Sequence, residues 1–342
     1  MSEPKLAVVG LGRIGIMHAR HAQEVGNVVA LVDANPARAA AFPGIPVFSS
    51  VEQLVDSGLA NAAIISTPTE LHADHAGALI RAGYRVLLEK PMTESLEKDL
   101  AFAAELDAKY PNALMLAFQR RFDGPLQYVK QLIGEGRIGR VFKVTSILED
   151  SGPAPVGYRS GGLLQDMSVH NVDEMLWLTG QFPVAATSGG SRLYAHRLRQ
   201  SEDVYDDGYL WLWFENELLG HIQVSRNHVS GYRIETWVFG EEGQIHMGRF
   251  EQNKREVIVE TYGRNERLDR RVFTMPEYAA DMPEFVPRFG PAYLEEARTF
   301  VECCRTGQPF PVTHTDGIRA MRVIEAALHA PMVKEKATPV VA

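Results

Sequence analysis

The stretch that decides the fold is Leu6-Ala7-Val8-Val9 followed by Gly10-Leu11-Gly12-Arg13-Ile14-Gly15. A short apolar run that ends in G-x-G-x-x-G and continues into a helical pattern is typical of a dinucleotide-binding turn. Gly10 permits the tight turn, Gly12 lets the backbone approach a pyrophosphate, and Gly15 permits close packing of helix on strand. The N-terminus of the helix then offers free N–H groups and a positive dipole end to the phosphates.

An acidic residue follows at the distance that this motif requires. Asp33 stands 18 residues after Gly15, at the end of the next apolar run, 28–32. A carboxylate there accepts hydrogen bonds from the adenosine ribose and repels a 2′-phosphate, so the sequence predicts NAD and disfavours NADP. Arg38 weakens this preference, because a nearby arginine can accommodate that phosphate. The alternative interpretation is an ordinary turn at a helix start with a solvated aspartate.

The chain has two halves with different hydrophobic rhythms. Up to about residue 120, short apolar runs (6–9, 28–32, 62–65, 85–88, 113–117) alternate with helical patterns (14–25, 69–82, 95–109). This alternation predicts a doubly wound parallel sheet of the Rossmann type, covered on both faces. We therefore assign 1–120 to a NAD-binding domain.

From about residue 140 the runs alternate loosely, as half-buried antiparallel strands do. The expected strands are 141–147, 209–214, 221–226, 234–239 and 256–262, with a hairpin loop at 241–243 and helices at 162–178, 292–304 and 316–329. We assign 121–342 to an α+β domain on a large, mostly antiparallel sheet, which would bind substrate and form oligomer contacts.

Composition excludes several classes of protein. The 342 residues carry a net charge of −8, which argues against a protein that mainly grips nucleic acid or anionic lipid. No apolar run approaches the ~20 residues of a membrane-spanning helix, and the start of the chain does not resemble a secretory signal. The two cysteines, Cys303 and Cys304, are adjacent and favour a reducing cytoplasm.

Polar residues follow two of the expected parallel strands. Ser66-Thr67-Pro68 comes after one buried run, and Glu89-Lys90-Pro91 ends the next. Loops at the carboxyl ends of parallel strands line the ligand crevice, so Lys90 is a candidate for substrate binding or proton transfer. The alternative for Lys90 is a solvent-exposed, salt-bridging lysine.

A carboxylate and a histidine share one face of the expected helix at 162–178. Asp166 and His170 are four residues apart, and histidine is the side chain best poised to accept a proton near neutral pH. A surface Asp–His pair is the alternative. Two further histidine pairs, His18/His21 and His72/His75, lack the cysteine or acidic partners of a zinc site, so we predict no metal.

Together these motifs resemble the glucose–fructose oxidoreductase / inositol dehydrogenase / rhizopine-catabolism (Gfo/Idh/MocA) family. The motifs in order are the glycine fingerprint with Asp33, Thr67-Pro68 with His72, Glu89-Lys90-Pro91, Phe118-Gln119-Arg120-Arg121-Phe122-Asp123, and Asp166-x-x-x-His170. The resemblance covers nearly the whole chain. It is strongest for the myo-inositol 2-dehydrogenase branch. The residues that carry this resemblance are the Arg-Arg-Phe-Asp segment and residues 161–170.

The resemblance implies roles for individual residues. Lys90, Asp166 and His170 match the family's catalytic lysine, aspartate and histidine, with His170 as the base. Arg121 resembles a substrate-contacting arginine and Tyr232 a substrate-side tyrosine, so the substrate-binding set is Lys90, Arg121, Asp166, His170 and Tyr232. The cofactor-binding residues assigned from the fingerprint and the resemblance are Gly10, Gly12, Arg13, Ile14, Gly15, Asp33, Ser66, Thr67, Pro68, His72, Glu89 and Lys90.

Two residues depart from the family's pattern. Asn171 follows the histidine where many inositol dehydrogenases have an aspartate, and Gln119 stands where an apolar residue is commoner. One altered hydrogen-bonding group in a site can reject a substrate strongly. Both residues are therefore expected to bear on which polyol is accepted.

The expected activity is NAD-dependent oxidation of a cyclic polyol or sugar, and an inositol-like polyol is the preferred candidate substrate. Alternatives are a pyranose dehydrogenase, a keto-sugar reductase, an oxidoreductase with trapped cofactor, and a non-catalytic dinucleotide-binding regulator. Trp211, Trp213 and Trp237 on expected strands predict an open apolar sheet face, and therefore a homodimer or homotetramer packed sheet to sheet.

Overall fold

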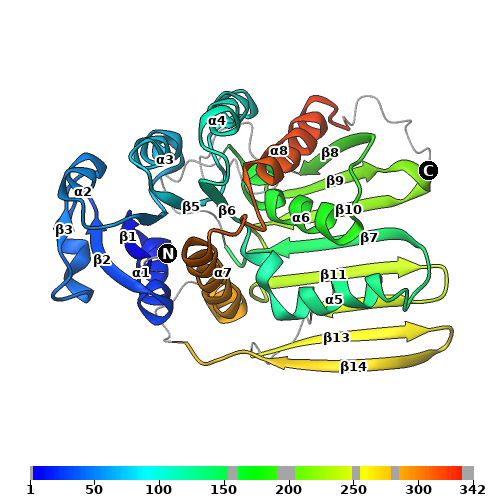
Figure 1. Ribbon diagram of the computed structural model, residues 1–342. Coiled ribbons are helices and arrows are strands. Elements are labelled where there is room, and N and C mark those ends of the chain that lie inside the picture. The colour runs from blue at the N-terminus through cyan, green and yellow to red at the C-terminus, as the bar shows by residue number, and fades with distance from the viewer. Residues whose placement is uncertain (1–2, 153–160, 192–204, 249–254, 279–284, 333–342) are drawn as a thin grey trace. The chain divides into compact units, whose positions relative to one another are not determined.

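The apolar runs of the first 120 residues form a six-stranded sheet in which every neighbouring pair is parallel, in the order β3-β2-β1-β4-β5-β6. The computed structural model describes residues 3–152, 161–191, 205–248, 255–278 and 285–332 (Figure 1). The strands are β1 (Lys5–Val9), β2 (Asn27–Val32), β3 (Val47–Phe48), β4 (Ala62–Ile65), β5 (Arg85–Glu89) and β6 (Leu114–Ala117). The helices between them are α1 (Arg13–Val25), α2 (Val51–Ser57), α3 (His72–Arg81) and α4 (Leu96–Lys109), with a 3-10 turn at Pro36–Ala41.

The first compact unit contains a segment from late in the chain. It comprises Met1–Asp123 and Phe289–Arg319, and so includes most of α7 (Val286–Thr306) and the start of α8 (His314–His329). Phe300 and Phe310 are buried in the same apolar cluster as Leu6 and Val8 of β1, which explains why this segment groups with the parallel sheet. The sequence prediction placed all of 121–342 in one domain, whereas residues 289–319 group with the parallel sheet.

The second unit is built on an eight-stranded sheet in the order β14-β13-β12-β11-β7-β10-β9-β8. The strands are β7 (Val141–Glu149), β8 (Ala185–Ser191), β9 (Asp207–Trp213), β10 (Leu219–Ser225), β11 (Arg233–Gly240), β12 (Gln244–Gly248), β13 (Glu256–Gly263) and β14 (Glu266–Thr274). Its pairs are antiparallel except β7 with β10, which is parallel. The prediction of a Rossmann sheet followed by a mostly antiparallel one is confirmed.

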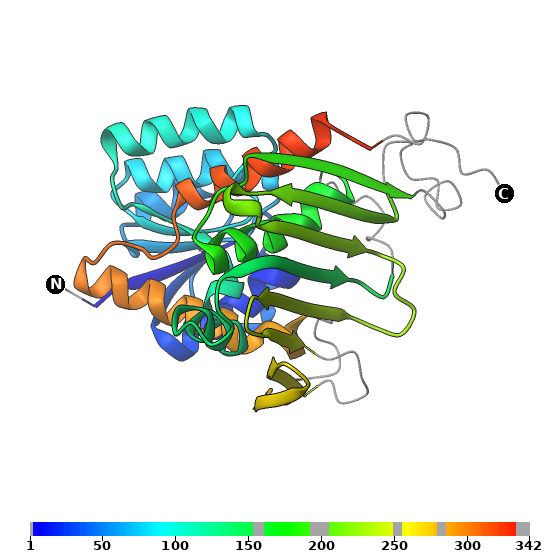
Figure 2. The same ribbon diagram turned by 90° about the vertical axis from the view of Figure 1, so that its right-hand side faces the viewer.

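Helices α5 (Gly124–Gly134) and α6 (Leu163–Thr179) pack on the second sheet. Figures 1 and 2 show both helices on the same face of it. Two glycines make room for α6: a Cβ at Gly208 of β9 would lie 2.5 Å from Leu164 Cδ2, and one at Gly220 of β10 would lie 2.4 Å from the Met175 sulfur. A side chain at either of these two glycine positions would therefore push the helix away from the sheet.

A buried polar network also fixes α6. Asn171 donates to Ser146 Oγ (2.7 Å), and Ser146 and Thr236 both donate to Glu174 Oε1 (3.0 and 2.5 Å). These four side chains are buried, so their mutual hydrogen bonds replace those that water would make. The network fixes the rotation of α6 about its axis, and hence the direction of its functional face. No helix in the described part of the chain is long and apolar enough to cross a membrane.

Candidate functional site

The glycine turn has the geometry of a pyrophosphate cradle. Gly10 has φ +87°, and a Cβ there would lie 2.9 Å from the backbone of Ser66 and Thr67. A Cβ at Gly15 would lie 1.8 Å from Gly10 O, so the protein's own packing requires both glycines. At Gly12 an added Cβ would meet nothing within 4 Å. Packing does not require that glycine, whereas the close approach of a ligand would.

Helix α1 begins at this turn without a side-chain cap at Gly12. Arg13 is exposed and Ile14 half-buried in its first turn. The helix start therefore presents backbone donors for an anion, and a pyrophosphate fits this place by charge and by shape.

Asp33 lies directly after β2 and is fixed by two backbone donors. Its Oδ2 accepts a hydrogen bond from Leu11 N (2.7 Å) and its Oδ1 accepts one from Asn35 N (2.8 Å). The exposed Arg38 side chain reaches Oδ2 at 3.5 Å. Oδ1 accepts only one of these bonds, so its second lone pair provides acceptor capacity for a ribose hydroxyl.

The loops after β4 and β5 are joined by His72. Its Nε2 lies 2.9 Å from Thr67 O and its Nδ1 lies 2.8 Å from Pro91 O. Burial lowers the pKa of His72, and the two carbonyl contacts oppose that effect. Ser66 donates to Gly10 O (3.0 Å). His72 and Ser66 therefore brace the crevice loops, and their direct contact with cofactor stays a prediction, as does that of Pro68 before the Thr69–Leu71 turn.

Glu89 is buried at the end of β5. Its Oε1 lies 2.8 Å from His18 Nε2, and its Oε2 accepts from the backbone N–H of Lys90 at 3.1 Å. Glu89 thus fixes the backbone of the half-buried Lys90, while its carboxylate is engaged inside the first unit. Glu296 of α7 is fully buried, and burial together with the charge of Glu89 raises its pKa well above the usual value.

Arg121 forms an ion pair in the first unit. Its Nη2 lies 2.8 Å from Asp316 Oδ1, and Asp316 also accepts from Thr313 N at the start of α8 (2.9 Å). Arg121 is mostly buried, with 12% of its side chain exposed. Contact of Arg121 with substrate stays a prediction. Gln119 is buried.

The second unit places Asp166 and His170 on α6 with a partner for the carboxylate that was not anticipated. Asp166 lies in the first turn of α6, where the helix dipole favours a negative charge, and His170 is half-buried one turn further on. Arg226, directly after β10, places its Nη2 2.5 Å from Asp166 Oδ2. Sixty residues separate the pair in sequence, and no spacing rule connects them.

Asn171 has a structural role in the second unit. It is fully buried and donates to Ser146 on β7. The departure at this position therefore bears on the support of α6, and its effect on which polyol is accepted stays a prediction.

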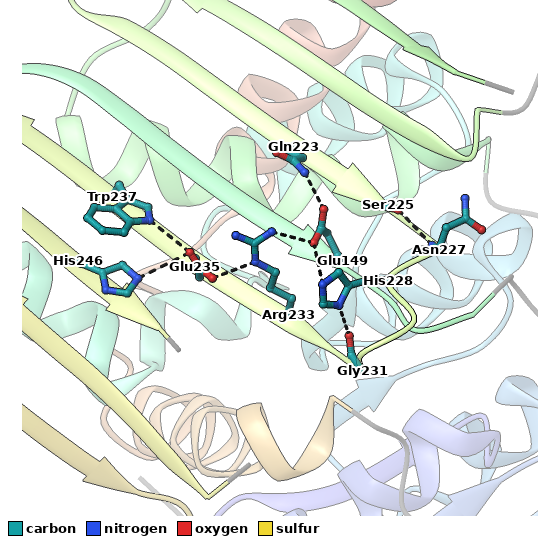
Figure 3. Close-up of polar contacts among 10 residues, drawn as sticks. All are labelled: Glu149, Gln223, Ser225, Asn227, His228, Gly231, Arg233, Glu235, Trp237 and His246. Carbon is teal, nitrogen blue, oxygen red and sulfur yellow. Dashed lines mark hydrogen bonds and ion pairs between the residues drawn. The ribbon is translucent and has the colours of Figure 1, made fainter. Parts of the chain in front are cut away.

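Tyr232 precedes β11 and is half-buried at the end of the loop 226–232. Charged side chains at the adjoining strand ends hold this loop. Glu149 of β7 lies 3.2 Å from Arg233 Nη1 and 3.7 Å from His228 Nε2, and Figure 3 shows the three side chains converging. His228 Nδ1 lies 2.6 Å from Gly231 O. This network extends along β11 to Glu235.

Comparison with known proteins agrees with these features. Residues 5–115 match the oxidoreductase family with an NAD-binding Rossmann fold, and 126–246 match the GFO/IDH/MocA C-terminal domain. The chain is 30% identical to an inositol 2-dehydrogenase of Rhizobium meliloti (95% of this chain, 96% of the relative). It is 29% identical to the scyllo-inositol 2-dehydrogenase (NAD(+)) of Bacillus subtilis (95% and 93%).

A solved scyllo-inositol dehydrogenase from Lactobacillus casei, with bound NAD(H) and scyllo-inositol, superposes with a TM-score of 0.80 at 25% identity. The superposition covers 96% of this chain and 97% of that one. The apo form of a Lactobacillus casei scyllo-inositol dehydrogenase gives a TM-score of 0.81 at 26% identity, with 96% of each chain covered. The fingerprint, the two-sheet fold and these matches together show that the chain belongs to the Gfo/Idh/MocA family of NAD-binding oxidoreductases.

Proposed function

We propose that this protein is an NAD-dependent dehydrogenase that oxidises a hydroxyl-bearing carbon of a cyclic polyol or sugar. An inositol-like polyol is the first candidate substrate. The observation that carries the proposal is the pairing of a histidine and a fixed carboxylate on adjacent turns of α6. The glycine cradle and Asp33 support NAD as the cofactor. The inositol dehydrogenases among the relatives support the substrate class.

The proposed chemistry assigns one task to each residue. His170 takes the proton from the substrate hydroxyl, because a neutral imidazole is a competent base near pH 7. Asp166 accepts a hydrogen bond from a substrate hydroxyl and favours the protonated histidine. Lys90 would donate to the reacting oxygen and, when NAD is bound, to its nicotinamide ribose. Arg121 and Tyr232 are the further substrate contacts.

Gly10, Gly12, Gly15 and the start of α1 would hold the pyrophosphate of NAD, and Asp33 would hold its adenosine ribose. The chemistry that NAD supplies when bound is acceptance of a hydride from the oxidised carbon. The remaining work of the protein is to hold the substrate carbon in reach and to move one proton.

The direct test is NADH appearance with a panel of inositols, aldoses and sugar acids, each offered with NAD and with NADP. We expect a polyol-dependent signal with NAD, and His170→Ala should reduce kcat about 10²–10⁴-fold with unchanged NAD affinity. His329→Ala, which alters an exposed histidine at the end of α8, is the matched control. Turnover by His170→Ala at the wild-type rate would remove His170 from the mechanism.

We also propose that the protein is a homodimer or homotetramer packed through the second sheet. The sheet face opposite α5 and α6 carries two aromatic stacks. Trp211 lies over His221 (4.2 Å between centroids) and Trp237 over His246 (3.9 Å), and Trp213 is 44% exposed. A broad aromatic face is suited to pairing with a second copy. A cytoplasmic location suits an NAD-dependent enzyme with two free cysteines.

A further inference from the structure

We infer that Arg226 is a positioning residue for Asp166: it selects the carboxylate orientation that the dehydrogenase reaction uses. The inference rests on the proposed function. Arg226 is not among the residues assigned above to catalysis, substrate or cofactor. Arg226, Asp166 and the residues that fix them all belong to the second unit.

The ion pair has the geometry of a strong interaction. Arg226 Nη2 and Asp166 Oδ2 are 2.5 Å apart, and only 12% and 10% of the two side chains are exposed. Charge-assisted hydrogen bonds are shorter and stronger than neutral ones, and shielding from water strengthens them further. An exposed pair such as Arg140–Glu241, with 60% and 53% of its side chains exposed, is weak by comparison.

The arginine is itself fixed by the backbone around the end of β10. Arg226 N donates to Asp206 O (3.1 Å), and Asp150 N donates to Ser225 O (2.8 Å). Asn227 N donates to Ser225 Oγ (3.1 Å). Ser225 is thus tied to Asp150, and the Asn227 amide reaches Asp207 Oδ2 of β9 (3.5 Å). The guanidinium therefore starts from a defined backbone position.

The loop after Arg226 is held as well. His228 N donates to Asp150 O (3.0 Å), and Gly231 N donates to His228 O (3.0 Å). Glu149 contacts Arg233 and His228 at the base of the loop, and it accepts a hydrogen bond from Gln223 (2.6 Å) (Figure 3). This loop ends at Tyr232, the proposed substrate-side tyrosine, so one anchored segment carries both the positioning arginine and that tyrosine.

The ion pair restricts the side-chain rotamer of Asp166. An aspartate in the first turn of a helix has more than one staggered χ1 available. An ion pair to a fixed guanidinium selects one of them and holds the carboxylate there before substrate arrives. Catalysis depends on such preorganisation, and misplacing a catalytic group by about 1 Å can reduce the rate about 10²-fold.

The test is a double-mutant cycle on polyol oxidation with Arg226→Gln, Asp166→Asn and the double variant. We expect Arg226→Gln to lower kcat for the polyol about 10–100-fold and to leave NAD affinity unchanged. In the Asp166→Asn background the same change should add less than about 2-fold, because Arg226 acts through Asp166. Independent, multiplicative losses would overturn the inference.

Two further readouts separate positioning from a general structural role. Guanidinium at non-denaturing concentration should partly restore turnover to Arg226→Ala but not to Arg226→Ala/Asp166→Asn. Arg226→Lys, which keeps the charge but not the planar fork, should fall between wild type and Arg226→Gln. Arg140→Ala, which removes an exposed ion-paired arginine of the same unit, should leave activity unchanged. Guanidinium rescue of both Arg226→Ala and Arg226→Ala/Asp166→Asn, or of neither, would contradict positioning through Asp166.

A stability cycle keeps the inference testable if the proposed function fails. Should the wild-type protein oxidise no polyol, the melting temperatures of the Arg226→Gln, Asp166→Asn and double variants still measure the coupling of the two side chains. Shifts in Tm that add independently would overturn the ion pair itself. Coupled shifts together with absent turnover would locate the failure in the proposed reaction.

Discussion

Asp33 Oδ2 accepts a 2.7 Å hydrogen bond from the backbone N–H of Leu11, inside the glycine turn. This bond joins the end of β2 to the loop between β1 and α1. The carboxylate proposed to bind ribose and the turn proposed to bind pyrophosphate are therefore held at a fixed separation. Cofactor choice and the shape of the turn depend on the same side chain.

Asp33→Ser should weaken NAD binding and relax the preference for NAD over NADP. Serine removes the charge that repels a 2′-phosphate, and Arg38, already 3.5 Å from the carboxylate, becomes available to that phosphate. We expect the ratio of NADPH to NADH affinity, measured by nucleotide fluorescence, to rise at least about 10-fold, or about 1.4 kcal/mol. Asp56→Ser, at an exposed position on α2, should leave the ratio unchanged. An unaltered ratio in Asp33→Ser would exclude Asp33 from cofactor selection.

Gly12→Ala and Gly15→Ala should fail in different ways. A methyl at Gly15 would lie 1.8 Å from Gly10 O, so that variant should lose stability and cofactor binding together. A methyl at Gly12 meets no protein atom within 4 Å, so that variant should melt near the wild-type temperature and bind NAD poorly. Thermal melts with and without NAD distinguish these outcomes. Tight NAD binding by Gly12→Ala would mean that the pyrophosphate does not approach this residue.

The ionisation of Glu235 makes stability depend on pH. Burial alone would raise the pKa of Glu235, but the nearby His246 ring and the hydrogen bond and charge of Arg233 outweigh it and lower the pKa to about 2 (Figure 3). As pH falls, the unfolded chain binds this proton near pH 4.5, whereas the folded chain resists it until about pH 2. The stabilisation is therefore complete above about pH 4.5 and is lost between that value and pH 2.

Glu235→Gln should lower the free energy of unfolding by about 1–3 kcal/mol at pH 7. The difference from wild type should shrink as pH falls below about 4.5, which denaturant titrations between pH 7 and pH 3 would measure. Glu241→Gln removes a carboxylate from an exposed ion pair and should stay within about 0.5 kcal/mol of wild type. A difference for Glu235→Gln that is independent of pH would contradict the lowered pKa.

Trp213→Glu should weaken self-association. The indole is 44% exposed on β9, at the aromatic face proposed to meet a second copy, and a carboxylate there would have to be desolvated on pairing. Light scattering should give a multiple of 38.0 kDa for wild type and a lower mass for the variant. Leu268→Glu, at a similarly exposed apolar position on β14, tests whether any exposed apolar residue has this effect. A wild-type mass of one chain would contradict the oligomer.

The sequence predicted elements whose hydrophobic pattern is strong. The five expected parallel strands and the helix at 162–178 are present, because buried strands and α6 are defined by apolar residues. β14 was missed because nearly all of its residues are exposed, which leaves no alternation to detect. α2 was missed because it is only seven residues long, although Ser50 caps its start and Gly58 ends it with φ +60°. The grouping of Phe300 with β1 is a long-range packing fact that no local pattern encodes.

Site residues could be predicted from the sequence where they lie together in one short motif. Asp166 and His170 share a helix, so their spacing alone places them on one face. Arg226 lies on another element, and only the pairing of β10 within the sheet brings it to Asp166. The orientation of Asn171 could not be predicted from the sequence either, because it depends on the Ser146 hydroxyl of β7. Only the packing of α6 on the sheet brings that hydroxyl close.

Asn171→Asp should therefore destabilise this protein. The Ser146 hydroxyl has one proton, which it gives to Glu174, so it accepts from the Asn171 amide. An aspartate cannot donate, and it would place a second carboxylate beside buried Glu174. We expect a loss of about 3 kcal/mol in the free energy of unfolding. Asn171→Ala adds no charge and should cost less. Equal stability of Asn171→Asp and wild type would show that position 171 tolerates the charge, and the polyol panel would then be the measurement to repeat on that variant.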